Sequence, residues 1–226
     1  MSPLLQLMPL TDAPAHLAWL GDDERTQLAA ITHFTRARQF VAGHCLARQL
    51  AADWAGGAAP EWRLRVADDG RRGLDHPRLA PLFVSISHGG ALLAAAVGGD
   101  PLGVDLESAG KQRDWVALAR TMFSPAEVEA LQACSDADRK SAFLDAWTLK
   151  EAWAKRSGRG LQRQSARQCT SVAWPAHGAE AWTWRLPDGG SLALATTSVA
   201  KLSIRGVVGE PRAWRYIESL ALSGPA

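Results

Sequence analysis

Residues 147–155 read Trp147-Thr148-Leu149-Lys150-Glu151-Ala152-Trp153-Ala154-Lys155. If this segment is helical, Trp147, Glu151 and Lys155 recur every four residues and share one face. Lys150 lies beside that face, one turn after Trp147. The spacing therefore predicts a helix in which a carboxylate, flanked by two ammonium groups and an indole, could accept a proton and hold an anion.

A second acidic pattern lies upstream, in Leu102-Gly103-Val104-Asp105-Leu106-Glu107. In a strand, residues i and i+2 point the same way, so Asp105 and Glu107 share one side. Two carboxylates on one side repel each other unless a cation lies between them. Carboxylate oxygens suit Mg²⁺, which commonly fills its shell with water and substrate phosphates. The alternative is that both patterns are solvated surface charges and simple helix ion pairs.

A third pattern follows a predicted strand and reads Ser85-Ile86-Ser87-His88-Gly89. In such a small-residue turn, exposed backbone N–H groups and an imidazole could meet a phosphate. A purely structural role for His88 is the alternative. Two arginine pairs, Arg36/Arg38 and Arg71/Arg72, would supply further charge-assisted hydrogen bonds to an anion.

Composition restricts the classes of protein to be considered. The 226 residues are enough for one large domain or two small ones, and 47% are apolar, so a real core can form. The 25 basic and 23 acidic side chains give a net charge of +2, which argues against a dedicated nucleic-acid binder. The three cysteines are odd in number and form no CxxC pair, which favours free thiols in a reducing compartment. No signal peptide or membrane-spanning run is evident, so we expect a cytoplasmic protein without a membrane contact.

The chain is predicted to form two similar halves. In the first half we expect an extended segment at 4–10, helices at 22–34 and 35–54, and strands at 62–66, 83–87, 92–97 and 102–107. In the second half we expect a helix from Ser124 to about 133, a helix over 136–156, and strands at 171–174, 182–186, 191–197 and 202–207. Ser124, Pro125 and Glu127 form a capping box that starts the first of these helices. Helices followed by strands twice over predict an α+β fold of two pseudo-duplicated lobes, 1–102 and 103–226, with the ligand site in the cleft between them. The last strand segment could pack back on the first lobe.

Taken in order, these patterns resemble the 4′-phosphopantetheinyl transferases, specifically the monomeric class that activates peptide and polyketide synthases. The resemblance covers about residues 20–165. It rests on Ser85-Ile86-Ser87-His88, Gly103-Val104-Asp105-Leu106-Glu107, Phe123-Ser124-Pro125-Ala126-Glu127, Trp147…Lys150-Glu151…Lys155 and Gly158-Arg159-Gly160-Leu161. Three positions depart from the family pattern: His44 stands where Arg is frequent, Gly89 where Ser often follows the His, and Gly70-Arg71-Arg72 where Gly-Lys-Pro is common.

The resemblance implies a monomeric enzyme that transfers the 4′-phosphopantetheine group of coenzyme A to a serine of an acyl or peptidyl carrier protein. Such enzymes serve fatty-acid, polyketide or nonribosomal peptide biosynthesis and release 3′,5′-ADP. Asp105, Glu107 and Glu151 would hold Mg²⁺. Glu151 would be the general base, with Glu107 as the alternative, and the adjacent lysines are expected to depress the pKa of Glu151.

Further roles follow from the same resemblance. Lys155, supported by Lys150, would stabilise the leaving phosphate. The expected coenzyme A contacts are Arg36, Arg38, Arg71, Arg72, Ser87, His88, Lys150 and Lys155. The carrier protein, typically acidic, would dock near the segment that contains Lys111, Arg113, Arg120 and two side chains expected to be exposed, Met122 and Phe123.

Two other functions are compatible with the same residues. Another Mg²⁺-dependent phosphoryl-transfer enzyme or a nuclease would share the carboxylates and lysines. A nuclease would need a basic nucleic-acid track, which the net charge of +2 does not favour. A carrier-binding module that has lost activity is the third possibility, and the intact Asp105, Glu107, Glu151 and Lys155 argue against it.

Overall fold

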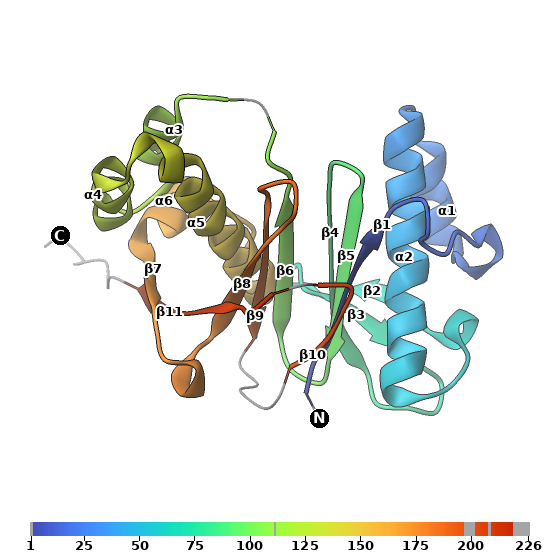
Figure 1. Cartoon of the computed structure of the whole chain (residues 1–226). Coiled ribbons are helices and arrows are strands. Elements are labelled where there is room, and N and C mark those ends of the chain that lie inside the picture. Colours follow the sequence, from blue (N-terminus) through green and yellow to red (C-terminus); the bar gives the residue numbers. More distant parts are fainter. Residues whose placement is uncertain (1, 111, 197–201, 208, 219–226) are drawn as a thin grey trace, which may run out of the picture.

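The computed structural model describes residues 2–110, 112–196, 202–207 and 209–218. The first sheet has the strand order β10-β1-β5-β4-β3-β2. Its strands are β1 (Leu4–Pro9), β2 (Arg63–Val66), β3 (Arg72–Asp75), β4 (Leu82–Gly89), β5 (Leu92–Gly98) and β10 (Ser203–Arg205). Helix α2 (Phe34–Ala55) covers one face of this sheet, and the short helix α1 (Asp22–Ala29) lies on α2 (Figure 1). The core of this half lies between α2 and the sheet.

The second sheet has the strand order β6-β9-β8-β11-β7. Its strands are β6 (Leu102–Glu107), β7 (Cys169–Ala173), β8 (Ala181–Arg185), β9 (Ser191–Thr196) and β11 (Arg212–Glu218). The long helix α5 (Asp136–Ser157) crosses this sheet, with α3 (Trp115–Met122), α4 (Pro125–Ala133) and α6 (Arg163–Gln168) around it (Figure 1). The capping box at Ser124 and Glu127 is present as predicted. α5 ends at Gly158, whose φ of 75° is the left-handed conformation that glycine adopts without strain.

The two sheets meet where β4 and β6 lie side by side. Here serine hydroxyls replace part of a strand ladder: Val104 N–H donates to Ser85 Oγ (2.9 Å) and Leu106 N–H donates to Ser87 Oγ (3.2 Å). A second core cluster runs across the junction, because Leu5 and Ala94 of the first sheet pack with Val104 and Leu192 of the second. The halves therefore form one continuous packed body, and side chains from both can reach a common site.

The observed α+β fold confirms the predicted class, and individual elements differ. α1 ends at Ala29, and residues 30–33 form the turn into α2. β3, α3, α6 and β11 were not predicted. β10, from the second half, pairs in parallel with β1 of the first sheet through Leu4–Ser203 and Leu5–Ile204. Lys111 and residue 197, the last of one predicted strand, lie outside the described residues. None of the described helices is long and apolar enough to cross a membrane.

Candidate active site

Close packing of α5 on β6 brings the acidic strand and the charged helix face together. A Cβ on Gly103 would lie 2.0 Å from the carbonyl oxygen of Ala152, so only glycine allows this approach. One turn further along the helix, Lys155 Nζ donates to Asp105 Oδ1 (2.8 Å) and to the carbonyl oxygen of Val104 (3.0 Å). The side chains of Asp105 and Lys155, 50 residues apart in sequence, are thus in direct contact.

Asp105 has one oxygen engaged and one without a protein partner. Oδ1 accepts hydrogen bonds from Ser87 Oγ (2.9 Å) and Lys155. Oδ2 is buried, and within the described residues nothing donates to it. A buried anionic oxygen without a donor is costly, and a bound cation would satisfy it. Ser87, predicted to contact the ligand, therefore contacts Asp105 in the structure.

Glu107 and Glu151 lie near Asp105 and are half-buried. Burial, followed by the charge of Asp105, raises the pKa of Glu107, against a hydrogen bond from Trp147. Burial and Asp105 also raise the pKa of Glu151, and Lys155 opposes them. The expectation that lysines depress the Glu151 pKa is wrong, because burial and the neighbouring carboxylate outweigh the one ammonium that acts on it.

These carboxylates fit a hard divalent cation. Asp105, Glu107 and Glu151 repel one another, which a cation would relieve. Among the residues that the structure describes, no three metal-ligating side chains stand as a ready-made cluster. That arrangement is compatible with Mg²⁺, which uses few protein oxygens and completes its octahedron with water and phosphate oxygens.

A cavity of about 590 Å³ opens beside this centre and is lined by both halves. Lys155, Gly158 and Gly160 come from the second half. From the first half come Gln27, Ile31, Arg36, Gln39, Phe40, His44, Gly70, Arg72, Val84, Ser85, Ile86 and His88. We call it the first cavity. Its volume and its three cationic side chains suit a large phosphorylated ligand.

Within the first cavity, Arg36 and His88 form a pair. Arg36 Nη1 lies 3.3 Å from His88 Nε2. Burial, then the charge of Arg36, lowers the pKa of His88, so the imidazole is neutral near pH 7 and accepts from the guanidinium. Arg36 lies on α2 and His88 lies on β4, and both side chains line the first cavity, where an anion could bind.

The other predicted arginines are placed differently. Arg72 lines the first cavity. Arg71 is held by Asp69, with Nε 2.7 Å from Oδ2, and its guanidinium lies 5.5 Å from the centre of the Phe83 ring. Arg38 is exposed on α2 and is not among the cavity-lining residues. The structure therefore brings Arg36 and Arg72 to the cavity and leaves Arg38 and Arg71 outside its lining.

Lys150 does not join the site. Its side chain is fully buried, and Nζ lies 2.8 Å from Glu127 Oε2, with hydrogen bonds to the carbonyl oxygens of Ala166 (2.6 Å) and Cys169 (2.5 Å). These partners lie on α4, α6 and β7, and none of them is a residue of the acidic centre. The predicted contact of Lys150 with a substrate phosphate is thus corrected to a structural role, because its ammonium is already fully engaged.

A second cavity of about 300 Å³ is lined in part by Glu107, which does not line the first cavity. Its apolar lining comes from α3 and α5 and includes Trp115, Leu118, Met122, Phe143, Leu144 and Trp147. Arg113 and Leu118 at this cavity are exposed. Phe123, expected to be exposed, is buried in the core beneath α3 and α4.

Several lining residues of the first cavity were missed by sequence reasoning, among them Gln27, Phe40 and His44. Gln27 lies on α1, and Phe40 and His44 follow Arg36 at intervals of four on α2. The four-residue spacing of Arg36, Phe40 and His44 was a usable signal, because it puts all three on one helix face. No local pattern indicated that α1 would form part of the wall.

Comparison with known proteins relates this chain to one family. Residues 101–197 match the family model for the 4′-phosphopantetheinyl transferase superfamily. The chain is 26% identical to the 4′-phosphopantetheinyl transferase HetI of Nostoc sp. over 202 residues, 88% of this chain and 84% of that protein. It is 28% identical to a 4′-phosphopantetheinyl transferase of Bacillus subtilis over 145 residues, 64% of this chain and 63% of that protein, slightly under two-thirds of its length.

The region matched by the family model contains the acidic strand β6, the helix α5 and the apolar second cavity. The longer match to HetI also takes in most of the first half, whose residues line the first cavity. Over residues 101–197 the chain thus matches the 4′-phosphopantetheinyl transferase superfamily, and its similarity to one transferase of that name extends over most of its length.

Proposed function

We propose that this chain is a 4′-phosphopantetheinyl transferase that moves the phosphopantetheine group of coenzyme A to a serine hydroxyl of an apo carrier protein and releases 3′,5′-ADP. The observation that carries the proposal is the contact of Lys155 with Asp105 at the junction of the two halves. Lys155 of this centre lines a polar, basic cavity, and Glu107 lines a second, apolar cavity. Coenzyme A has the matching division, a phosphorylated nucleotide joined through a diphosphate to a largely uncharged arm.

The two cavities support one orientation of the substrate. The nucleotide and its 3′-phosphate would occupy the first cavity, where Arg36, Arg72 and His88 offer donors. The diphosphate would lie over Asp105 and Lys155. The pantetheine arm would run past Glu107 toward the second cavity, whose tryptophans and aliphatic side chains suit an uncharged chain.

The reaction exchanges one phosphorus–oxygen bond for another. The serine oxygen of the carrier attacks the phosphorus that bears the pantetheine arm, and the bond from that phosphorus to the bridging diphosphate oxygen breaks. The electron pair leaves with 3′,5′-ADP. Glu151 takes the serine proton, and Lys155 donates to the phosphate oxygens as negative charge develops on them.

Asp105, Glu107 and Glu151 would hold Mg²⁺, which when bound neutralises charge on the diphosphate. The buried, unpartnered Oδ2 of Asp105 supports this assignment. Ser87 and Lys155 hold Oδ1, so the free oxygen keeps a fixed direction. Glu107 remains the alternative base.

The docking partner would be an acidic, helical carrier domain. Arg113 is exposed at the second cavity and Arg120 is exposed on α3, and both could pair with carrier carboxylates. Leu118 is 37% exposed at the same place and offers an apolar contact. We propose that the enzyme acts in the cytoplasm as a monomer, since one chain supplies every residue of the centre.

Incubation with coenzyme A, Mg²⁺ and apo acyl or peptidyl carrier domains tests the function. Intact-protein mass spectrometry should show a gain of one phosphopantetheine group on the carrier serine, and EDTA should prevent it. Carrier binding without any mass gain would indicate a non-catalytic binding module. Cleavage of DNA or RNA in place of carrier modification would indicate a nuclease.

A further inference from the structure

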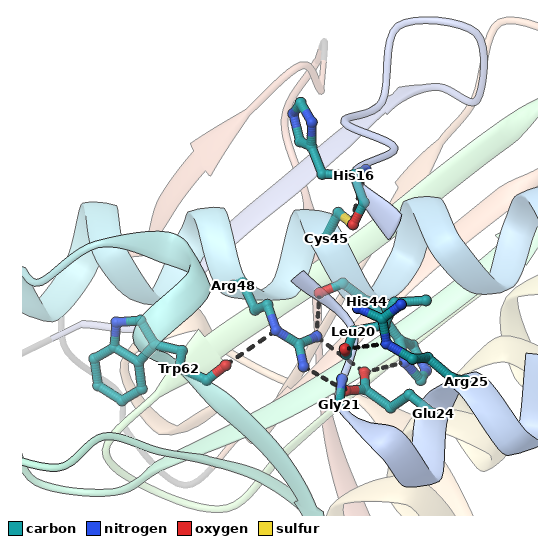
Figure 2. A network of polar contacts seen from close by, with 9 residues as sticks. All are labelled: His16, Leu20, Gly21, Glu24, Arg25, His44, Cys45, Arg48 and Trp62. Atoms are coloured by element: carbon teal, nitrogen blue, oxygen red, sulfur yellow. Dashed lines mark hydrogen bonds and ion pairs between the residues drawn. The ribbon is translucent and has the colours of Figure 1, made fainter. Parts of the chain in front are cut away.

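A buried polar network connects α1 to α2 at the wall of the first cavity (Figure 2). Glu24 Oε2 lies 2.5 Å from Arg48 Nη2, and Glu24 Oε1 accepts from Arg48 Nη1 (3.0 Å). His44 Nδ1 lies 2.7 Å from the same Oε1. Arg48 is completely buried, and its Nε donates to the carbonyl oxygen of Trp62 (3.0 Å). Arg48 therefore ties Glu24 to the core of the first half.

Glu24 is the main anchor of α1. It is the one buried residue of this helix, which the structure describes throughout. It also accepts from the Gly21 N–H (2.8 Å), so it fixes the start of the helix as well as its contact with α2. Burial alone would raise the pKa of Glu24, but hydrogen bonds from His44 and Arg48 outweigh burial and lower it to about 2. Glu24 is thus an anion at neutral pH.

The position of this anchor matters because α1 and His44 face the first cavity. Gln27 of α1, Ile31 just after it and His44 of α2 all line that space. His44 is also packed on Phe40, with ring centres 4.0 Å apart, so both its ring plane and its Nδ1 are fixed. Among described residues no protein group is bonded to the remaining nitrogen, Nε2, which leaves it available to a ligand.

We propose that Glu24, held by Arg48, is a positioning residue that fixes α1 and the His44 ring around the first cavity and so sets the affinity for the nucleotide half of coenzyme A. This inference rests on the proposed function. The network makes no contact with Asp105, Glu107 or Glu151, the predicted reacting and metal-binding groups. Its loss should therefore weaken substrate binding while leaving the rate of the chemical step nearly intact.

The test compares Glu24→Gln with the wild-type protein. Glutamine keeps the shape of the side chain and removes its charge. We expect KM for coenzyme A to rise roughly tenfold or more, since hydrogen bonds to charged groups are the strong ones, with kcat within about threefold of wild type. The Kd for 3′,5′-ADP, measured by calorimetry without a carrier, should rise in parallel. KM for the carrier should stay unchanged.

Glu61→Gln is the matched control. Glu61 is also a capping glutamate that pairs with a histidine and an arginine, His76 and Arg78, in the same half. It lines a separate cavity and not the first one. This variant should leave the affinity for 3′,5′-ADP unchanged.

His44→Asn keeps the inference testable if Glu24→Gln does not fold. The asparagine amide can replace Nδ1 as a donor to Glu24 and lacks a group at the position of Nε2. It should weaken 3′,5′-ADP binding while keeping a near wild-type melting temperature. Unchanged Kd values in both variants, or equal losses in KM for both substrates, would overturn the proposal. If wild type binds 3′,5′-ADP tightly but modifies no carrier, the proposed function fails while the Glu24 comparison still decides this inference.

Discussion

Asp105 accepts hydrogen bonds from side chains of both halves of the molecule. Its Oδ1 is held by Ser87 from β4 and Lys155 from α5, and its Oδ2 has no donor among the described residues. Burial raises the pKa of Glu107 and of Glu151, and the charge of Asp105 raises both further. A single charge thus acts on the other two acidic groups, and the roles of those two have to be separated by experiment.

Glu151→Gln and Glu107→Gln should give different responses to Mg²⁺. Loss of a general base typically costs 10²–10⁴-fold in rate, so we expect kcat of Glu151→Gln to fall by about 100-fold or more at every Mg²⁺ concentration. Glu107→Gln should be partly restored by excess Mg²⁺, because a weakened metal site is refilled by mass action. The measurement is initial rate against Mg²⁺ at saturating coenzyme A. Rescue of Glu151→Gln but not of Glu107→Gln would assign the base to Glu107.

Glu24 should stabilise the fold in a pH-dependent way. Its folded-state pKa of about 2 lies below the ordinary value of 4.5, so its contribution is fully present above about pH 4.5 and is lost as the pH falls through about 2. The shift corresponds to about 3 kcal/mol. The difference in unfolding free energy between wild type and Glu24→Gln, from urea titrations, should be largest near pH 6 and shrink toward pH 2. A difference that stays constant over this range would contradict the assignment.

The sequence alone could not decide which of the two lysines, Lys150 or Lys155, reaches a substrate phosphate. Both flank Glu151 in the helical pattern, and either could have reached a phosphate. The choice depends on contacts far away in sequence: Glu127 and the carbonyl oxygens near Cys169 take the ammonium of Lys150, and Asp105 takes that of Lys155. The Glu24–Arg48 pair was unpredictable for the same reason, since it joins side chains on two different helices.

Among the elements, the contact between β6 and α5 depends on Gly103. In Gly103→Ala the new methyl group would meet the carbonyl oxygen of Ala152 and the backbone nitrogen of Arg156, 2.0 Å and 2.7 Å from the ideal Cβ position. Overpacking of this kind costs about 1–3 kcal/mol. We also expect kcat to fall by about tenfold or more, because a displaced α5 moves Lys155 and Glu151 away from Asp105.

Thermal unfolding and initial rates measure both effects of Gly103→Ala. Gly99→Ala is the control, since its Cβ would meet only Trp54 at an ordinary 3.6 Å. Wild-type activity in a well-folded Gly103→Ala protein would show that the site does not need this close approach.

Lys150 should act on stability and not on the reaction. Lys150→Met leaves Glu127 as an unpaired buried carboxylate, and breaking a buried ion pair in this way typically costs about 3–5 kcal/mol. The kcat of the folded protein, measured well below its melting temperature, should remain within about threefold of wild type. Lys140→Met, which removes a partly exposed lysine of the same helix, should change neither quantity. A large loss of kcat with little loss of stability would show that Lys150 takes part in the reaction.

Elements with strong local signals could be predicted, and others could not. The capping box at Ser124 correctly started α4, and the helix predicted over 136–156 is α5, which ends one residue later at Ser157. β11 was missed because only Tyr216 of its seven residues is buried, so its polarity pattern is weak. β3 was missed because its four residues are too few to show an alternation of apolar and polar side chains. α3 does have a signal, since Asp114 accepts from the Ala117 N–H as an N-cap, and this signal was overlooked.

At the scale of the whole molecule, the predicted cleft between halves is a seam between packed sheets. β4 and β6 are joined through serine hydroxyls, β10 returns to the first sheet, and Gly158 after α5 touches the β2–β3 turn. A Cβ on Gly158 would lie 2.4 Å from the carbonyl oxygen of Asp69. The first cavity is therefore built from parts of both halves that are already in contact, and a ligand there should bind to both at once.

Hydrogen exchange with and without 3′,5′-ADP tests this joint binding. A ligand that contacts both halves should slow amide exchange in the first turns of α2, near Arg36, and also in the turn that contains Gly158 and Gly160. Peptides around Glu61, which line a separate cavity, should be unaffected and serve as the internal reference. Protection confined to the first half would mean that the nucleotide site is complete without α5. In that case the ligand would engage the second half only when the diphosphate reaches Lys155, and coenzyme A, but not 3′,5′-ADP, should protect the Gly158 turn.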